Sequence, residues 1–203
     1  IISTTVREHE HVAAFLIGKQ QVVIFNNVQV SLLVEKEVNG GKVPIPLIID
    51  NASEQRIDAI TEQIDKARNQ PMTKEDIVLH NKSTKLERIY FSLPGFIRRA
   101  FWRFLLQHPH IAYKKMGNVG ITSIGTKGGL SGWFIPISIH PICFGIGSIT
   151  KKPVVVDDAI VIREMLPMTV LMDHDVIDGR SMAQFLQKLA DNIVKDGLGN
   201  VDN

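Results

Sequence analysis

The chain has 203 residues and a formal net charge of +2, with 44% hydrophobic and 22% charged residues. This balance is typical of a globular domain that buries a substantial core, and it excludes a nucleic-acid binder that depends on a strong positive field. Cys143 is the one cysteine, which excludes an internal disulfide and favours a reducing compartment, so we expect a cytoplasmic protein.

The N-terminal half is predicted to combine helical and β segments. Residues 4–17 place apolar side chains at a rough helical period, and residues 21–25 and 28–34 are β-rich. A hairpin loop is predicted at Asn39-Gly40-Gly41. The following strand, residues 43–49, contains two prolines, which favours an edge or a bulge.

Three helices are expected next. Asn51-Ala52-Ser53-Glu54 resembles a capping box before an amphipathic helix over residues 53–68. A short helix is expected to start within Thr73–Ile77, and the run over 92–106 predicts another. Its apolar and basic part, Phe96–Leu106, fits a membrane-surface helix or a subunit interface, and its broad apolar arc favours the interface.

The C-terminal half is predicted to be mostly β and to end in a helix after Gly179. The expected strands are residues 118–124, 134–139, 142–149 and 168–172, with a hairpin around Asp157-Asp158-Ala159. We find no linker, so we predict a single two-layer α+β domain over residues 1–203 with a mixed sheet. The chain starts with neither Met nor a signal-peptide pattern, so we expect an N-terminal segment of the natural chain upstream of Ile1.

The run DHDVIDG contains the spacing His-x-x-x-Asp-Gly, from His174 through Asp178 to Gly179. A histidine at the end of a rigid strand can accept a proton from a thiol or a hydroxyl near neutral pH. Asp178 could close the loop by pairing with an arginine or with backbone amides, and Gly179 permits a special φ or a close approach. On spacing alone, a loop histidine beside a helix-capping aspartate explains the pattern better than a catalytic base.

The sequence segments around this motif favour the catalytic interpretation of His174. The run DHDVIDGRSMAQFLQKLADNI resembles the active-site signature of the 2-oxo acid dehydrogenase acyltransferases, the dihydrolipoamide acyltransferase catalytic domains related to chloramphenicol acetyltransferase. The segments NVGITSIGTKGG and ICFGIGSITKKPVVVDDAIVIREMLPMTVLMDHD are similar to the parts of that family that precede the motif. The loop GGLSGWFIPISIHPICFGIGSI is closer to stand-alone homologues without a lipoyl domain. The resemblance covers most of residues 10–195 and implies the chloramphenicol acetyltransferase-like fold.

The resemblance also implies roles for particular residues. The motif histidine, here His174, would act as general base on the thiol of coenzyme A or dihydrolipoamide. A hydroxyl of the family's equivalent strand would stabilise the oxyanion, which assigns Thr122, with Ser123 as the fallback. Asp178 would be a structural support with an arginine partner that the sequence does not identify. Asp175 departs from the arginine that often follows the family's histidine, and Thr122 departs from the usual serine.

The same resemblance implies a CoA-dependent acyltransferase that uses acyl-CoA as substrate and needs no metal. It also implies a homotrimer, or a multiple of trimers, whose sites lie between subunits, and a lipoyl group on a partner protein as acceptor. The alternatives are a non-catalytic trimeric scaffold that retains the fold and, less favoured, a condensation-type domain, which has a longer chain and a second histidine where this chain has Asp173.

Five other features have a structural and a functional interpretation. Trp133 is a candidate for a substrate-channel wall, and His140 could line the acyl pocket although a surface or core histidine is favoured. Cys143 lies in an apolar strand and is expected in the core. The pairs His9/His11 and His108/His110 lack a third metal ligand, so we expect no metal site. The loop over residues 125–129 lacks the Gly-Lys-Ser/Thr ending of a nucleotide-binding P-loop, which leaves proximity to pantetheine or the coenzyme A phosphates open.

Overall fold

The computed structural model describes residues 1–18, 20–38, 41–69, 92–124 and 132–198. Its centre is a five-stranded sheet in the order β4-β3-β5-β6-β9. Strand β5 pairs in parallel with β3 and β6, while the edge strands β4 and β9 pair antiparallel, so the sheet is mixed as predicted. The strands span Gly41–Ile49 (β4), Val30–Val38 (β3), Val119–Ser123 (β5), Ile142–Ile146 (β6) and Met168–Met172 (β9).

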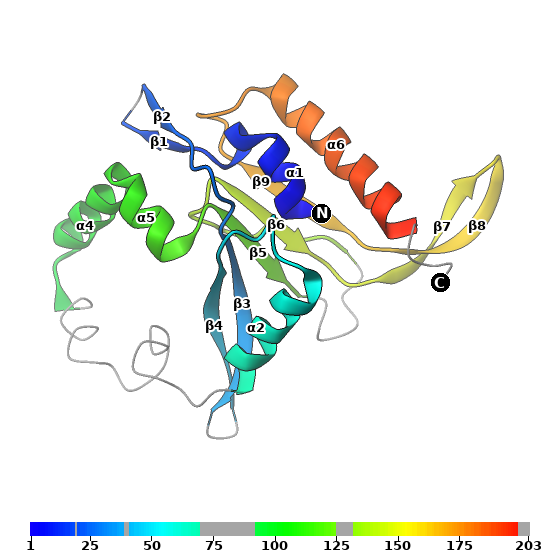
Figure 1. Cartoon of the computed structure of the whole chain (residues 1–203), viewed down its shortest axis with the longest axis horizontal. Coiled ribbons are helices and arrows are strands. Elements are labelled where there is room, and N and C mark those ends of the chain that lie inside the picture. The colour runs from blue at the N-terminus through cyan, green and yellow to red at the C-terminus, as the bar shows by residue number, and fades with distance from the viewer. Residues whose placement is uncertain (19, 39–40, 70–91, 125–131, 199–203) are drawn as a thin grey trace.

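Three helices cover one face of this sheet: α1 (Ile2–Glu8), α2 (Ile57–Asn69) and α6 (Gly179–Leu198) (Figure 1). Phe144 of β6 and Phe185 of α6 are both fully buried in the core between them. Alternate residues of a strand face opposite sides of the sheet, so Val119 and Ile142 join this core while Gly120 and Cys143 face away from it. The predicted two-layer α+β architecture is therefore confirmed.

Strand β4 confirms the prediction for its prolines. It pairs only with β3 among the described strands, and Pro44 and Pro46 are both exposed. A proline lacks the N–H of a ladder hydrogen bond, which an edge strand tolerates on its open side. Strand β3 extends to Val38 and β4 begins at Gly41, so Gly41, which the sequence places in the predicted loop, belongs to a strand.

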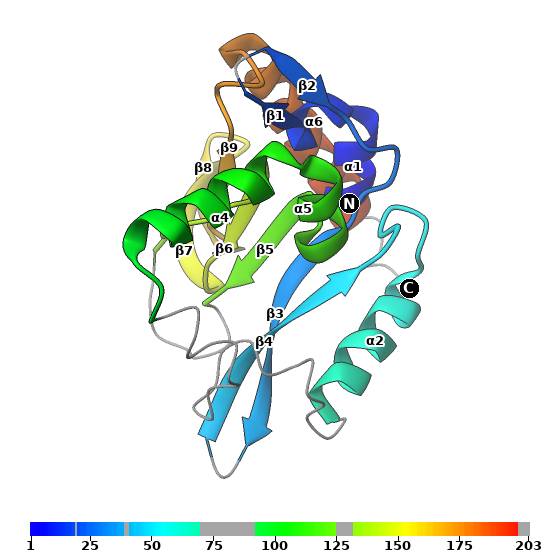
Figure 2. The same ribbon diagram turned by 90° about the vertical axis from the view of Figure 1, so that its left-hand side faces the viewer.

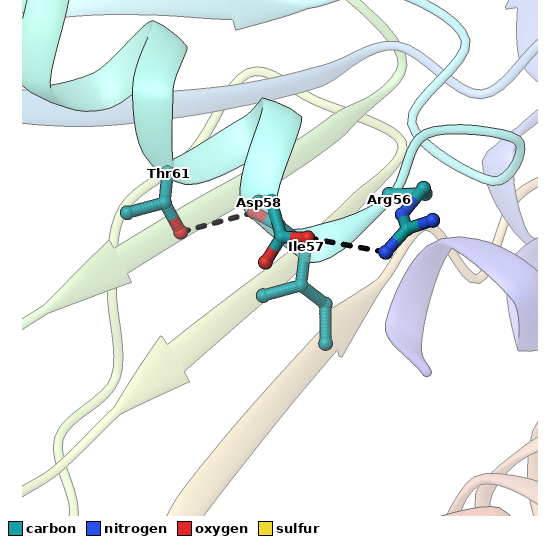
Figure 3. A network of polar contacts seen from close by, with 4 residues as sticks. All are labelled: Arg56, Ile57, Asp58 and Thr61. Carbon is teal, nitrogen blue, oxygen red and sulfur yellow. Dashed lines mark hydrogen bonds and ion pairs between the residues drawn. The ribbon is translucent and has the colours of Figure 1, made fainter.

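Helix α2 begins at Ile57, and the predicted start at Ser53 is wrong. The Asn51 amide does donate to Glu54 Oε2 over 2.6 Å, but Asn51 has a left-handed φ of 49° and the pair closes a turn. Figure 3 shows the actual start of the helix, where Arg56 lies 3.3 Å from Asp58 and the Thr61 hydroxyl donates to the Ile57 carbonyl over 3.0 Å. The capping-box pattern thus identifies a local contact without fixing where the helix starts.

The helical period predicted for residues 4–17 is right for the first part of this range, which belongs to α1, and wrong for the second. After α1 a 3-10 turn covers Glu10–Ala13, and β1 (Phe15–Ile17) then pairs with β2 (Gln21–Val23) in a separate hairpin. Gly18 adopts a positive φ of 62° beside the turn, which a glycine accepts without strain. The apolar run Phe-Leu-Ile is therefore strand, because the turn that follows it provides a pairing partner.

The remaining elements lie around the sheet. Figure 2 shows α4 (Gly95–Gln107) and α5 (Pro109–Met116) together on the side away from α2. The sequence predicts α4 but not α5, whose Pro109 begins the helix. Strands β7 (Thr150–Val156) and β8 (Ala159–Met165) form the predicted hairpin, with left-handed φ values at Asp157 and Asp158. The predicted short helix at Thr73–Ile77 lies outside the described residues.

Candidate functional site

His174 lies in a tight turn at the end of β9. Asp173 builds this turn: its N–H donates to the Pro141 carbonyl over 3.0 Å, and its carboxylate accepts the Asp175 N–H over 3.0 Å. The Asp173 carbonyl accepts the Val176 N–H over 3.2 Å. The His174 side chain is exposed and has no hydrogen bond or ion pair within the described parts of the chain. The backbone around the imidazole is therefore fixed while both ring nitrogens remain accessible to a substrate.

Asp178 caps the N-terminus of α6. Its carboxylate accepts the Ser181 N–H over 2.8 Å, and its carbonyl accepts the Met182 N–H over 3.0 Å. The hydrogen bond from the Ser181 backbone, with a further one from the Ser181 hydroxyl, lowers the pKa of Asp178. The sequence predicts an arginine or backbone amides as partners of this carboxylate, and in the structure its hydrogen bond comes from a backbone amide. Gly179 is the first helical residue, and a Cβ there would meet no atom within 4 Å, so its predicted role in substrate approach stays a prediction.

We expect replacement of Asp178 by alanine to lower the melting temperature, because the Ser181 N–H at the start of α6 loses its carboxylate acceptor. Asp178→Asn keeps an acceptor and removes only the charge. The folded pKa is depressed, so the charge stabilises the fold above the unfolded pKa of about 3.9 and this contribution disappears as the pH falls through the folded value. Thermal unfolding at pH 7 and at lower pH measures both effects. Equal melting temperatures for Asp178→Asn and wild type at pH 7 would contradict the charge effect.

Thr122 and Ser123 end strand β5 and line a depression, which we call the β5 cavity. The Thr122 hydroxyl has no hydrogen-bond partner among the residues described, and its side chain is half-buried. A free hydroxyl at a strand end can donate to an oxyanion. The β5 cavity has a volume of about 630 Å³ and is lined by residues of β3, β4, β5 and α2, among them Leu33, Glu35, Glu37, Pro44, Ile64 and Arg68.

The strand register separates Thr122 from His174. Met172, two residues before His174, pairs with Ile142 of β6, and Ile142 pairs in turn with Val119 of β5. Thr122 lies three residues further along β5, which is about 10 Å at the strand rise per residue, and two strand spacings away across the sheet. The β5 cavity shares no lining residue with the cavity beside Asp173. One copy of the chain therefore does not bring the predicted base and the predicted oxyanion donor together.

An extended segment, residues 132–140, crosses the face of the sheet opposite the core. The prediction that residues 134–139 form a strand is wrong, because the segment lies on the sheet face instead of pairing at its edge. Two glycines make room for it. A Cβ at Gly145 would lie 3.1 Å from Pro136, and one at Gly120 would lie 2.8 Å from His140 Nδ1.

The outer side of this segment forms an apolar row. Trp133, Ile135, Ile137 and Ile139 alternate with inward-facing residues, and each is at least 49% exposed. A contiguous apolar surface of this kind is typical of an interaction site. Trp133, predicted as a substrate-channel wall, begins the row and remains a candidate for that role.

His140 is held on the inner side. Its Nδ1 is 2.9 Å from the Ser138 hydroxyl, and its Nε2 is 2.9 Å from the Met116 carbonyl. Burial lowers the pKa of His140, which favours a neutral ring that donates through Nε2 and accepts through Nδ1. Cys143 is buried as predicted, and burial raises the pKa of its thiol. The contact between His140 and Met116 anchors the 132–140 segment to the end of α5.

The two histidine pairs have structural contacts. His9 packs edge-on against Phe185, with ring centroids 5.9 Å apart, and His110 packs against Phe25 at 5.2 Å. Within the described ranges, no group of three or more potential ligands could hold a metal ion. Phe15 and Leu16 of β1 line the cavity beside Asp173, and the sequence does not predict this contribution because the short run before Gly18 has no chemical motif. Within the same ranges, every helix is too short or too polar to span a bilayer.

Residues 111–196 match the catalytic-domain model of the 2-oxoacid dehydrogenases acyltransferase family, which confirms the resemblance found in the sequence. A dihydrolipoyllysine-residue acetyltransferase component of the pyruvate dehydrogenase complex from Corynebacterium glutamicum is 36% identical over 81 residues, which are 38% of this chain and 12% of that protein. The corresponding component from Staphylococcus aureus is 43% identical over 61 residues, 29% of this chain and 14% of that protein. The chain therefore matches less than a fifth of the length of these relatives.

Solved structures resemble nearly the whole chain. A probable dihydrolipoamide acetyltransferase from Listeria monocytogenes superposes with a TM-score of 0.61 and 21% identity, over 96% of this chain and 67% of that one. The dihydrolipoamide acetyltransferase of Azotobacter vinelandii superposes with a TM-score of 0.59 and 20% identity, over 94% and 63%. At these identities the likeness establishes the fold, and it confirms the predicted acyltransferase fold for the described residues.

Proposed function

We propose that this chain, whose residues 111–196 carry the catalytic-domain pattern of the 2-oxoacid dehydrogenase acyltransferases, transfers an acyl group between coenzyme A and a thiol acceptor. The observation that carries the proposal is the geometry of His174. Its backbone is fixed by the Asp173 turn and its exposed imidazole has no partner in the described structure. A general base requires both a fixed position and a free nitrogen.

The chemistry needs no covalent intermediate on the protein. His174 accepts the proton of the attacking thiol, and the thiolate adds to the thioester carbonyl carbon. The negative charge of the tetrahedral intermediate falls on the carbonyl oxygen, where a hydroxyl donor such as Thr122 stabilises it. The intermediate then collapses, the carbon–sulfur bond to the leaving thiolate breaks, and the His174 imidazolium returns the proton to that thiolate.

The complete site requires a second copy of the chain. Because His174 and Thr122 lie at opposite ends of the sheet, the imidazole of one copy would meet the hydroxyl of another. The exposed row from Trp133 to Ile139 provides apolar surface for such a contact. We propose a homotrimer or a multiple of trimers, in which Phe96 and other exposed residues of α4 contribute to subunit contacts rather than to a membrane surface.

The acceptor is proposed from the relatives. They are named as dihydrolipoyllysine acetyltransferase components, and a relative from Pseudomonas putida is a lipoamide acyltransferase component of a branched-chain complex. The Azotobacter vinelandii structure concerns a serine, a histidine and an asparagine in the catalytic mechanism, the latter two four residues apart. His174 and Asp178 have this spacing, which supports the assignment. A dihydrolipoyl group on a cytoplasmic partner protein is the proposed acceptor.

A thiol-release assay tests the function directly. Purified chain is incubated with acetyl-, propionyl- and isobutyryl-CoA, with and without dihydrolipoamide, and free coenzyme A and acyl-dihydrolipoamide are measured together. We expect the two products to appear in equal amounts and only when the acceptor is present. Absence of acyl-CoA binding and of both products would favour the alternative, a trimeric scaffold without turnover.

A further inference from the structure

A cavity lies beside the turn that carries His174, and we call it the β1 cavity. Its volume is about 420 Å³, which falls in the range of small-molecule sites. Figures 1 and 2 both show the β1–β2 hairpin beside the loop that leads from β9 to α6. The β1 cavity is lined by three segments: Ala14–Leu16 from β1 and the residue before it, 138–141 from the extended segment, and 171–173 from the end of β9.

The side chains that a ligand would meet in the β1 cavity are mostly apolar. Phe15, Leu16, Ile139, Leu171 and Met172 contribute hydrocarbon surface. The polar wall groups of the 138–141 segment are already used: the Ser138 hydroxyl contacts His140 Nδ1, and His140 Nε2 contacts the Met116 carbonyl. A ligand in this cavity is therefore recognised by burial of its own apolar surface.

The cavity wall and the turn of the proposed base are physically joined. Asp173 lines the cavity, donates its N–H to Pro141 of the opposite wall, and precedes His174 directly. A group held in the β1 cavity consequently lies beside the turn that carries His174. The β5 cavity at Thr122 has no such connection and contains Glu35, Glu37 and Arg68, which suit a more polar part of a substrate.

We propose that the β1 cavity binds the aliphatic chain of the acyl group, so that the chain prefers thioesters of uncharged aliphatic acids, and that Leu16 sets the accepted chain length. This inference rests on the proposed function. Leu16 is suited to this role because it is half-buried on a two-stranded hairpin outside the main sheet, where a change of side chain alters the cavity more than the core.

The test compares Leu16→Ala and Leu16→Phe with wild type on acetyl-, butyryl-, hexanoyl- and octanoyl-CoA. Each additional methylene that the cavity buries is expected to raise kcat/KM about fourfold, the factor that corresponds to about 0.8 kcal/mol. Leu16→Ala should extend the rise to longer chains, and Leu16→Phe should end it earlier. Val22→Ala is the matched control, because Val22 pairs with Leu16 across the hairpin but does not line the cavity.

Three outcomes overturn the inference, and they differ from one another. If wild type transfers acyl groups and both Leu16 variants keep its chain-length profile, the cavity does not hold the acyl chain and the proposed function stands. If the variants change the preference for the length of the thiol acceptor instead, the cavity belongs to the acceptor. If wild type transfers no acyl group from any thioester, the proposed function is wrong and this inference is wrong with it.

Discussion

Replacing His174 by alanine is expected to lower kcat for acyl transfer by about 10²- to 10⁴-fold, the usual contribution of a positioned general base. The structure gives a physical reason for a large and selective loss. The turn that holds residue 174 depends on backbone groups and on the Asp173 carboxylate, and the imidazole itself makes no hydrogen bond, ion pair or ring contact in the described chain. Removing it should leave the fold and the melting temperature nearly unchanged.

His108→Ala serves as the matched histidine control. His108 is exposed between α4 and α5 and contacts only the Phe104 carbonyl and ring in the described structure, far from the β9 end in sequence. The measurement is kcat and KM for acyl-CoA at saturating dihydrolipoamide, beside the melting temperature of each variant. Wild-type turnover in His174→Ala would refute the assignment of the base. A lower melting temperature together with lost activity would indicate a structural role instead.

The parts of the fold that the sequence predicts well are those with a repeated local signal. The strand Met168–Met172 and the helix after Gly179 have the predicted type, because a β-rich run is followed by a turn and then by one apolar helical face. The hairpin at Asp157-Asp158 is equally local. The edge position of β4 follows from its prolines, which no central strand accommodates.

The errors occur where tertiary packing decides the structure. Phe15–Ile17 continues an apolar helical pattern but pairs as β1, and residues 134–139 alternate like a strand but lie across the sheet. Residues 134–139 can lie there because Gly120 and Gly145 have no side chains. The spacing of these two glycines in the sequence does not indicate that they face the same segment. For the site, the sequence predicts His174, Thr122 and the capping alternative for Asp178, whereas the β1 cavity needs three segments that meet only in the fold.

Mixed assemblies of two inactive variants are expected to regain activity. Thr122→Val removes the hydroxyl and keeps the β-branched shape, so it should lower kcat by about 10²- to 10³-fold, the usual loss for one oxyanion donor. If His174 and Thr122 come from different copies, a copy with Thr122→Val still supplies a histidine, and a copy with His174→Ala still supplies a hydroxyl. In a trimer that contains both variants, one of the three interfaces combines both intact groups, so about a third of the wild-type rate should return.

The two variants are co-expressed with different affinity tags and purified through both, so that only mixed assemblies are assayed. The control pairs His174→Ala with the double variant His174→Ala/Thr122→Val, which supplies no histidine and should regain nothing. Ser123→Ala is measured beside Thr122→Val, because full activity in Thr122→Val would move the donor to the fallback residue. Inactive mixed assemblies of the two single variants would show that one copy provides both groups. The register of β5, β6 and β9 argues against that result, since about 10 Å along the strands already separates Thr122 from the level of Met172, two residues before His174.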